Sequence, residues 1–572
     1  MQSRRVPAVI AALAAAYGLV SITAALRPAQ RERWHSLQSF IPTQASAFAT
    51  AATAVSGLLM IFIAHGLYRR KRRAWRLAMG LSVILVAAHV VKSFHIRAAA
   101  AALVLVIVLA VARKEFYAQG DPTTRWFAGG AFVAITGAGF LSGELMLELY
   151  ENRLVSGHSF GAKAVTVLVG MVGMDGPVRF TNARTAWVVG SVLFGYGILA
   201  AVVTLYLLLR PQEPRPWLTT EDETRIRALL TKHGHRDSLG YFALRPDKSV
   251  VWSPSGKAGV SYRVVAGVGL ASGDPLGDPE AWPGAIEPWL ELCRQHAWVP
   301  AVVGCSEQAG IVYRRHGLHV LEIGDEAIVD AATFSLAGRN MRNVRQAVKR
   351  VERAGYTAAV RRQSEVPDEE LGEIARTADA WRGGSTERGF SMALGRFGDP
   401  GDADCVVVTA HLDGQLRALL NFVPWGPDGL SLDLMRRDRT ADNGLNEFLI
   451  TELLAACERL GVKRVSLNFA MFRAAIERGE KLGAGPVSKG WGRLLVFASR
   501  WWQIESLYRF NAKFGATWAP RYICYAAPWS LARIAVAAME AEAFWRRPHP
   551  FQVLAGRKPL GYGQHAVERV DT

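Results

Sequence analysis

Long stretches without a charged residue dominate the first 209 residues of the chain. Seven such runs occur, at residues 6–26, 45–67, 77–91, 98–112, 126–143, 164–174 and 185–209. Several approach the ~20 apolar residues with which a helix crosses a bilayer. The pattern therefore predicts a multi-pass α-helical membrane domain over residues 1–209. It has six helices if the run 164–174 enters the membrane without crossing it, and seven if that run crosses.

After residue 217 the pattern changes to short β-rich runs and amphipathic helices. The runs 406–412 and 416–423 flank Asp413-Gly414, a dipeptide favoured in two-residue hairpin turns because both positions tolerate positive φ. A strand at 430–435, a helix at 443–460 ending at Gly461 and a strand at 462–469 follow. An earlier stretch shows a related order, with predicted strands at 250–252, 260–270, 298–303 and 318–323 and predicted helices at 285–296 and 307–316.

This order predicts an α/β domain over residues 218–572 with tandem folds like those of GCN5-related acyltransferases, by fold-level analogy. The two halves span roughly 218–355 and 356–530, and a C-terminal tail follows. Residues 210–217 contain three prolines, which prevent the last membrane helix from continuing, so we expect a linker there.

Charge divides the chain at the same place. Residues 1–217 hold 22 Lys and Arg against 8 Asp and Glu, whereas residues 218–572 hold 45 against 41. Six cations between residues 69 and 76 mark one loop as cytoplasmic by the positive-inside rule. With six helices, the second domain is then cytoplasmic as well, although Arg27, Arg31 and Arg33 would lie outside, against the rule.

Cysteine and histidine usage limits the chemistry. The five cysteines form no C-x-x-C pair, which favours reduced thiols in the cytosol, and no Cys/His cluster has metal-ligand spacing. The nearest match to a coenzyme A loop, residues 480–485, begins with Glu480 where that loop needs a cation or an amide. We therefore expect no metal and no cofactor.

One predicted helix, within residues 334–355, separates apolar from basic positions. Only Glu352 offsets six cations, whereas a solvated helix face usually mixes the two signs. The pattern favours a phosphate-binding stripe for tRNA or anionic lipid headgroups over an ordinary solvated face. The cations are Arg339, Arg342, Arg345, Lys349, Arg350 and Arg353.

Asp433-Leu-Met-Arg436 ends the predicted strand at 430–435. Strictly extended residues three apart point to opposite faces, so Asp433 and Arg436 cooperate only if the chain bends after Met435. A structural salt bridge is the alternative. Further on, residues 508–522 mix aromatic residues with cations that include Lys513 and Arg521, a composition that favours packing.

Taken together, these strings resemble the bacterial phosphatidylglycerol lysyltransferase family of multiple-peptide-resistance-factor type, over roughly residues 260–525. The resemblance rests on several motifs in order, including Ser272-Gly-Asp-Pro-Leu-Gly277, Asp433-Leu-Met-Arg436 and the segment from Lys513 to Arg521. The strings are most similar to the branch with a fused lysyl-tRNA synthetase. Because this chain stops at Thr572, we expect a separate enzyme to supply the aminoacyl-tRNA.

The resemblance implies two acyltransferase-like folds that meet at a tunnel for tRNA and lipid. It implies transfer of an amino acid, lysine first, from aminoacyl-tRNA to the glycerol hydroxyl of phosphatidylglycerol in the plasma membrane. Asp433 and Arg436 match the family's active site. Lys513 and Arg521 match further functional positions, although Asn511 stands where the longer branch commonly has lysine. The cationic product would weaken the attraction of cationic antimicrobial peptides to the cell surface.

Several alternatives stay open at this point. The enzyme could transfer alanine or another amino acid, or use a different lipid. The chain could also be a non-catalytic lipid transporter or scaffold, or a peptidyl transferase acting on cell-wall precursors. A homo-oligomer is one alternative for its assembly.

Overall fold

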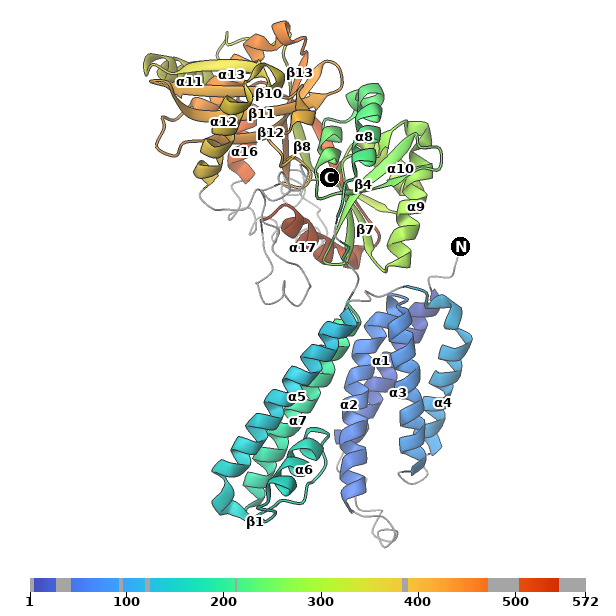
Figure 1. The fold of residues 1–572 in the computed structure, drawn as a ribbon. Helices are drawn as coiled ribbons and strands as arrows, with labels where there is room; N and C mark the ends of the chain where they lie inside the picture. Colours follow the sequence, from blue (N-terminus) through green and yellow to red (C-terminus); the bar gives the residue numbers. More distant parts are fainter. Residues whose placement is uncertain are drawn as a thin grey trace. The chain divides into compact units, whose positions relative to one another are not determined.

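The computed structural model describes residues 5–26, 43–91, 96–118, 124–210, 213–214, 216–382, 389–471 and 504–544. The chain divides into two compact units (Figure 1). Met1–Gln212 form the main part of the first, and Glu213–Cys293 with Trp298–Arg547 form the second. The division falls inside the proline-rich stretch 210–217. The loop 480–485 and the tail after residue 544 lie outside the described residues.

The first unit is helical. Three stretches among the described residues are long and apolar enough to cross a membrane, namely Val6–Thr23, Arg125–Leu149 and Ala183–Leu208. A short antiparallel pair, β1 (Leu154–Ser156) with β2 (Arg179–Phe180), flanks α6. The helices are α1 (Arg5–Leu26), α2 (Thr43–Tyr68), α3 (Arg72–Val91), α4 (Ile96–Val111), α5 (Thr124–Leu149), α6 (Phe160–Met171) and α7 (Ala183–Leu208).

Helix α6 contains most of the run whose crossing the sequence left open. Its 12 residues span about 18 Å at the rise of an α-helix, well short of the ~30 Å apolar core of a bilayer. The side chain of Ser159 caps its first turn by accepting a hydrogen bond from the Ala162 N–H. The length of α6 favours the alternative in which this segment enters the membrane without crossing it, and the number of crossings stays a prediction.

A 12-stranded mixed sheet forms the centre of the second unit. Its strands lie in the order β3 (Ser249–Trp252), β4 (Ala258–Val265), β5 (Val268–Ser272), β7 (Val299–Cys305), β14 (Thr517–Tyr525), β8 (His319–Asp330), β13 (Arg464–Met471), β12 (Gly429–Arg437), β11 (Gln415–Trp425), β10 (Val406–Leu412) and β9 (Thr357–Arg362), and β6 (Leu276–Gly277) pairs with β4. The helices are α8 (Thr220–His233), α9 (Trp282–Gln295), α10 (Glu307–Arg315), α11 (Arg342–Arg353), α12 (Asp368–Arg382), α13 (Leu445–Leu460), α16 (Ile504–Ala512) and α17 (Leu531–Ala541).

Each half of this sheet is an antiparallel meander that ends in a parallel pair. In the first half β5 pairs in parallel with β7, and in the second half β12 pairs in parallel with β13. The halves then exchange strands: β8 follows α10 but pairs with β13, whereas β14 comes from the end of the chain and pairs with β7. Because β8 and β14 also pair with each other, the two predicted α/β halves share one continuous sheet.

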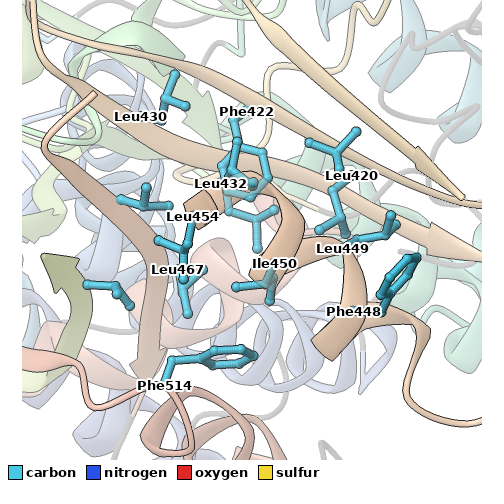
Figure 2. Close-up of a cluster of buried hydrophobic side chains, with 14 of the residues drawn as sticks. Leu420, Phe422, Leu430, Leu432, Phe448, Leu449, Ile450, Leu454, Leu467 and Phe514 are labelled. Carbon is cyan, nitrogen blue, oxygen red and sulfur yellow. The ribbon is translucent and has the colours of Figure 1, made fainter. Parts of the chain in front are cut away.

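Figure 2 shows the main core of the second half, where strand residues face α13. Leu420, Phe422 and Leu432 of the strands lie beside Leu449, Ile450 and Leu454 of the helix, and Leu430 and Phe448 belong to the same core. A smaller core lies on the opposite face, where Leu419 and Leu434 pack against Leu371 and Ile374 of α12. The second half is therefore a sheet covered by helices on both faces.

Local turn chemistry explains one correct prediction and one error. Asp413 and Gly414 both take positive φ (52° and 73°) and join β10 to β11, which confirms the predicted hairpin. The predicted single strand at 260–270 is wrong, since Ala266 and Gly267 take positive φ (52° and 70°) and turn the chain between β4 and β5. Alternating apolar residues on both sides of this dipeptide hid the turn.

Candidate active site

Asp433 lies on β12, at a β-bulge. Phe422 of β11 pairs with Leu432, but the next residue back, Asn421, pairs with Leu434, so Asp433 is the extra residue of the bulge. Before the bulge Leu432 faces the α13 core, and after it Met435 packs against that core instead. The bulge therefore shifts the alternation of side chains along β12 by one residue.

This shift puts Asp433 and Arg436 on the same face of the sheet. Asp433 accepts a hydrogen bond from the Leu394 N–H (2.6 Å) and another from the Asn421 side-chain amide (2.8 Å). Arg436 pairs with Asp379 of α12 at 2.7 Å, on the face that carries α12. The expected bend after Met435 is wrong in position, because the irregularity that aligns the two residues lies at Asp433 itself.

The parallel pairing between β12 and β13 ends two residues before Asp433. β12 and β13 pair in parallel only from Gly429↔Arg464 to Ser431↔Ser466. Beyond that point Asn468 of β13 adopts a left-handed backbone (φ 68°), and its side-chain amide donates to the Leu432 carbonyl at 2.6 Å. Asparagine tolerates this conformation better than most residues. Past Ser431 the two strands are therefore joined through the Asn468 side chain and no longer through a backbone ladder.

Three polar side-chain atoms without a hydrogen-bond partner in the described part of the chain lie on the strands beside the end of this ladder. Within the described residues, the side-chain oxygens Asn421 Oδ1, Ser431 Oγ and Asn468 Oδ1 are buried and have no hydrogen-bond partner. Such groups are uncommon in folded proteins because each carries a desolvation cost. Together with the carboxylate of Asp433 they are acceptor atoms, which suit groups that donate hydrogen bonds, such as hydroxyl and ammonium groups. The sequence motif marked Asp433 but gave no sign of these three neighbours.

Arg521 occupies a different environment, at the seam where β14 meets β8. It is only 4% exposed and donates to Glu326 (2.9 and 2.5 Å), Asp237 (2.8 Å), Ser238 Oγ (2.7 Å) and the Gly304 carbonyl (3.1 Å). Burial alone would lower the pKa of Arg521, but the charges of Glu326 and Asp237 outweigh it and raise the pKa above its ordinary value. The guanidinium is enclosed by protein partners.

The Ser272-to-Gly277 motif joins the same network. The Asp274 N–H donates to Asp237 (2.8 Å), and the Asp274 carboxylate accepts from the Ser306 N–H (2.7 Å) and hydroxyl (2.6 Å). Burial, followed by the negative charge of Asp237, raises the pKa of Asp274 to about 7. Gly273 has φ 68°, and a Cβ there would lie 2.7 Å from Asp237 Oδ2, so this turn requires glycine. The motif therefore has a structural role, because its buried hydrogen bonds hold loops of the first half together.

Lys513 lies on the other side of the sheet from Asp433. Its ammonium contacts Glu447 of α13 at 2.8 Å and lies 5.3 Å from the centre of the Phe510 ring. Its side chain is 37% exposed, so an approaching phosphate can reach it. The structure thus brings Asp433 and Arg436 to one face, Lys513 to the α13 side and Arg521 to the seam.

Helix α11 buries its apolar side and exposes its cations. Val344, Ala347, Val348 and Val351 are buried, and the three valines belong to the α13 core. Arg345 is half-buried and donates to the carbonyls of Leu336 and Gly338. The other cations are exposed, and over the part of the chain that the structure describes they make no ion pair: Arg339, Arg342, Lys349, Arg350 and Arg353.

The structure therefore joins a helical unit, three of whose described helices are long and apolar enough to cross a membrane, to an α/β unit built on one mixed sheet, which is the arrangement of a membrane protein with a second folded domain. The family model for the C-terminal part of phosphatidylglycerol lysyltransferase matches residues 227–525. The chain belongs to this family. A second family model, the transmembrane region of lysyl-tRNA synthetase, matches residues 2–211.

Curated relatives match nearly the whole chain. The lysylphosphatidylglycerol biosynthesis bifunctional protein LysX of Rhodococcus opacus is 42% identical over 552 residues, covering 95% of this chain and 49% of that protein. LysX of Mycobacterium avium is 42% identical over 554 residues, covering 95% and 47%. The chain therefore spans about half the length of these relatives.

Among solved structures, L-PGS from Bacillus licheniformis is 23% identical, with a TM-score of 0.49, and the match covers 59% of this chain and all of that one. The C-terminal domain of a putative lysylphosphatidylglycerol synthetase from Agrobacterium fabrum is 25% identical, with a TM-score of 0.47, covering 56% and 96%.

Proposed function

We propose that this chain transfers lysine from lysyl-tRNA to the terminal glycerol hydroxyl of phosphatidylglycerol. The observation that carries the proposal is the carboxylate of Asp433 at a β-bulge, beside the end of the β12–β13 pairing and three unsatisfied polar atoms. Membership of the phosphatidylglycerol lysyltransferase family supports the reaction class, and the names of the relatives support lysine as the amino acid.

The reaction exchanges one ester for another. The lipid hydroxyl attacks the carbonyl carbon of the aminoacyl ester, a new C–O bond to the lipid forms, and the C–O bond to the tRNA ribose breaks. The proton of the lipid hydroxyl ends on the ribose oxygen. Because the aminoacyl ester is already activated, the main task of the protein is to orient the hydroxyl and move this proton.

Asp433 is the group that we assign to this task. The Leu394 N–H donates to one oxygen of the Asp433 carboxylate, and the Asn421 side-chain amide donates to the other. These two donors fix the direction of the carboxylate, which would accept the hydrogen bond of the lipid hydroxyl. Asn421 is thus a positioning residue, acting through Asp433.

The cations take separate roles in this proposal. Arg436 pairs with the exposed carboxylate of Asp379, an ion pair that a lipid phosphate could replace at little cost. The half-exposed Lys513 holds a phosphate of the tRNA acceptor end, and the exposed cations of α11 attract the tRNA backbone. Arg521 acts indirectly, by holding β14 and β8 together.

The membrane unit would keep the enzyme at its lipid substrate in the plasma membrane. With the basic loop between α2 and α3 on the inside and six membrane crossings, the second unit is cytoplasmic, where aminoacyl-tRNA is found. Such a product lipid would carry extra positive charge and reduce the attraction of cationic peptides.

The test incubates membranes containing the full chain with phosphatidylglycerol and tRNA charged with radiolabelled lysine or alanine, followed by thin-layer chromatography and mass spectrometry. We expect an RNase-sensitive lysylated lipid. Asp433→Asn should lower the rate by about 10²–10⁴-fold, the usual contribution of a positioned acid or base, in a protein that still folds, although one of the two donors to Asp433 loses its acceptor. Transfer of alanine alone would change the assigned amino acid, and wild-type turnover by Asp433→Asn would remove this residue from the mechanism.

A further inference from the structure

Exposed large apolar side chains in the second unit gather at its first and last segments. Within its described residues they are Trp217, Ile311, Trp529, Val536 and Phe544, and the two tryptophans are 70% and 73% exposed. Trp217 precedes α8, and three of the others flank or belong to α17. Exposed tryptophans at such levels are unusual on a surface that meets only water.

Helix α17 has apolar residues on both sides. Ile534, Ala537 and Ala541 are buried against the sheet of the first half. The outward stripe begins at Trp529, just before the helix, and runs through Ala532 and Val536, and Glu540 follows on the same side one turn after Val536. Two large apolar side chains, Trp529 and Val536, are thus exposed together on the outward side, which favours contact with a second apolar environment.

The helix is fixed firmly enough to present that stripe. Arg533 donates two hydrogen bonds to the carbonyl of Ala266, in the turn between β4 and β5 (2.9 and 2.6 Å). Trp217 lies near the same strands, because its N–H donates to Ser249 Oγ and Ser249 pairs with Tyr262 of β4. Leu218 and α17 also pack on the same core. The two exposed tryptophans thus belong to one side of the first half.

The covalent chain indicates what this surface meets. Only residues 209–216 separate α7, a helix of membrane-spanning length, from Trp217, and eight residues reach about 30 Å at most when fully extended. After Phe544 the sequence continues Trp545-Arg546-Arg547. Tryptophan and arginine are the residues that concentrate at membrane–water interfaces and near anionic headgroups.

We propose that the face formed by Trp217, Trp529 and Val536 docks on the surface of the lipid bilayer that holds this chain's own membrane helices. Docking buries the tryptophan rings at headgroup level and holds the second unit against the membrane. The docking itself does not depend on the proposed reaction, whereas the activity measurement below rests on it.

A fluorescence experiment tests the docking in the full chain. The five native cysteines are all buried, so a cysteine introduced by Trp529→Cys or Val536→Cys can be labelled selectively with an environment-sensitive dye. In phosphatidylglycerol-containing vesicles we expect a blue-shifted emission that nitroxide-labelled lipids quench. The matched control is Ile311→Cys on α10, a position that is 38% exposed, where emission should stay water-like and unquenched.

Each other outcome overturns the proposal. A label at residue 529 that behaves like the control shows that the face meets water. A blue-shifted label that lipid nitroxides do not quench shows that another part of the chain covers the face. Shielding that rises with protein concentration shows a second copy of the chain instead of the bilayer.

The transfer activity on vesicle lipid gives a second, independent test of the docking. Trp529→Ser with Val536→Ser should raise the KM for phosphatidylglycerol in vesicles about tenfold, equivalent to about 1.4 kcal/mol of binding, with turnover of a dispersed short-chain lipid unchanged. Ile311→Ser should change neither. Equal loss with both lipids would indicate a damaged fold and overturn the assignment. A quenched label in a protein without any transfer activity would retain docking and refute the proposed function.

Discussion

Two groups in the second unit each contain an aspartate and an arginine, but they lie in different surroundings. Asp237 and Arg521 lie at the seam, buried, with Glu326 and the Ser238 hydroxyl completing their hydrogen bonds. Asp433 and Arg436 lie on one face of β12, beside polar atoms that have no partner among the described residues. Residue type alone therefore does not distinguish an enclosed ion-pair cluster from the group to which we assign the reaction, whereas the hydrogen bonds around the two groups differ.

The largest effect should come from opening the seam cluster. Arg521→Met leaves Asp237 and Glu326 buried without their cation, so we expect a loss of about 3–5 kcal/mol in the free energy of unfolding. Urea unfolding of the full-length protein in detergent measures it. Adding Glu326→Met should recover part of the loss, because an apolar replacement removes one unpaired charge. Unchanged unfolding together with abolished transfer would place Arg521 in the reaction.

For the Asp433–Arg436 group we expect a larger effect on lysine transfer than on the free energy of unfolding. Arg436→Met should lower lysine transfer by about 10–100-fold, because it removes the cation that we assign to the lipid phosphate, and a hydrogen bond to a charged group contributes about 1.5–3 kcal/mol. The free energy of unfolding should change less than with Arg521→Met, since Arg436 is 13% exposed and its partner Asp379 is 55% exposed, whereas the seam cluster is buried on all sides. Asp379→Asn is the matched control and should retain transfer. Equal losses in the two variants would make the ion pair structural.

Buried Lys248 should make the stability of the second unit depend on pH. Its ammonium is buried, donates to Ser272 Oγ (2.7 Å) and the Phe242 carbonyl (3.0 Å), and burial lowers its pKa from 10.5 to about 7. Between pH 7 and about 10 the unfolded chain therefore binds more protons than the folded one. Stability should rise with pH across this window by up to about 1.4 kcal/mol per unit.

Lys248→Met should remove this slope. Unfolding free energies of both proteins between pH 6 and 10 provide the comparison. Parallel curves would show that Lys248 keeps its ordinary pKa in the fold.

The smallest effects should come from α11, because its cations act from the surface. Replacing Lys349, Arg350 and Arg353 with glutamine should weaken tRNA binding and reduce the slope of log K against log salt by about one for each phosphate that is no longer neutralised. Arg225→Gln on α8, an exposed cation paired with Glu221, is the control. An unchanged salt slope would leave α11 as an ordinary solvated helix.

Local patterns in the chain were sufficient for much of this description. Hydropathy indicated the helices of the first unit, Asp413-Gly414 indicated the hairpin, and the spacing around Val344 and Val348 indicated an amphipathic helix. Such features depend on residues within one or two turns of each other, so composition and periodicity report them directly. Asp433 also stood out, through the motif in which it lies.

Other features depend on partners far away in the chain. Arg521 meets Asp237 across 284 positions, and β14 reaches the first half only by strand exchange with β8. The bulge at Asp433 exists because Asn421 and Phe422 of another strand set its register. Pairing register and buried charge are decided by which distant segments meet, and no local pattern carries that information. The amino-acid pattern thus determines the elements and their exposed chemistry, whereas tertiary pairing decides which Asp–Arg group is enclosed at the seam and which lies on the face of β12.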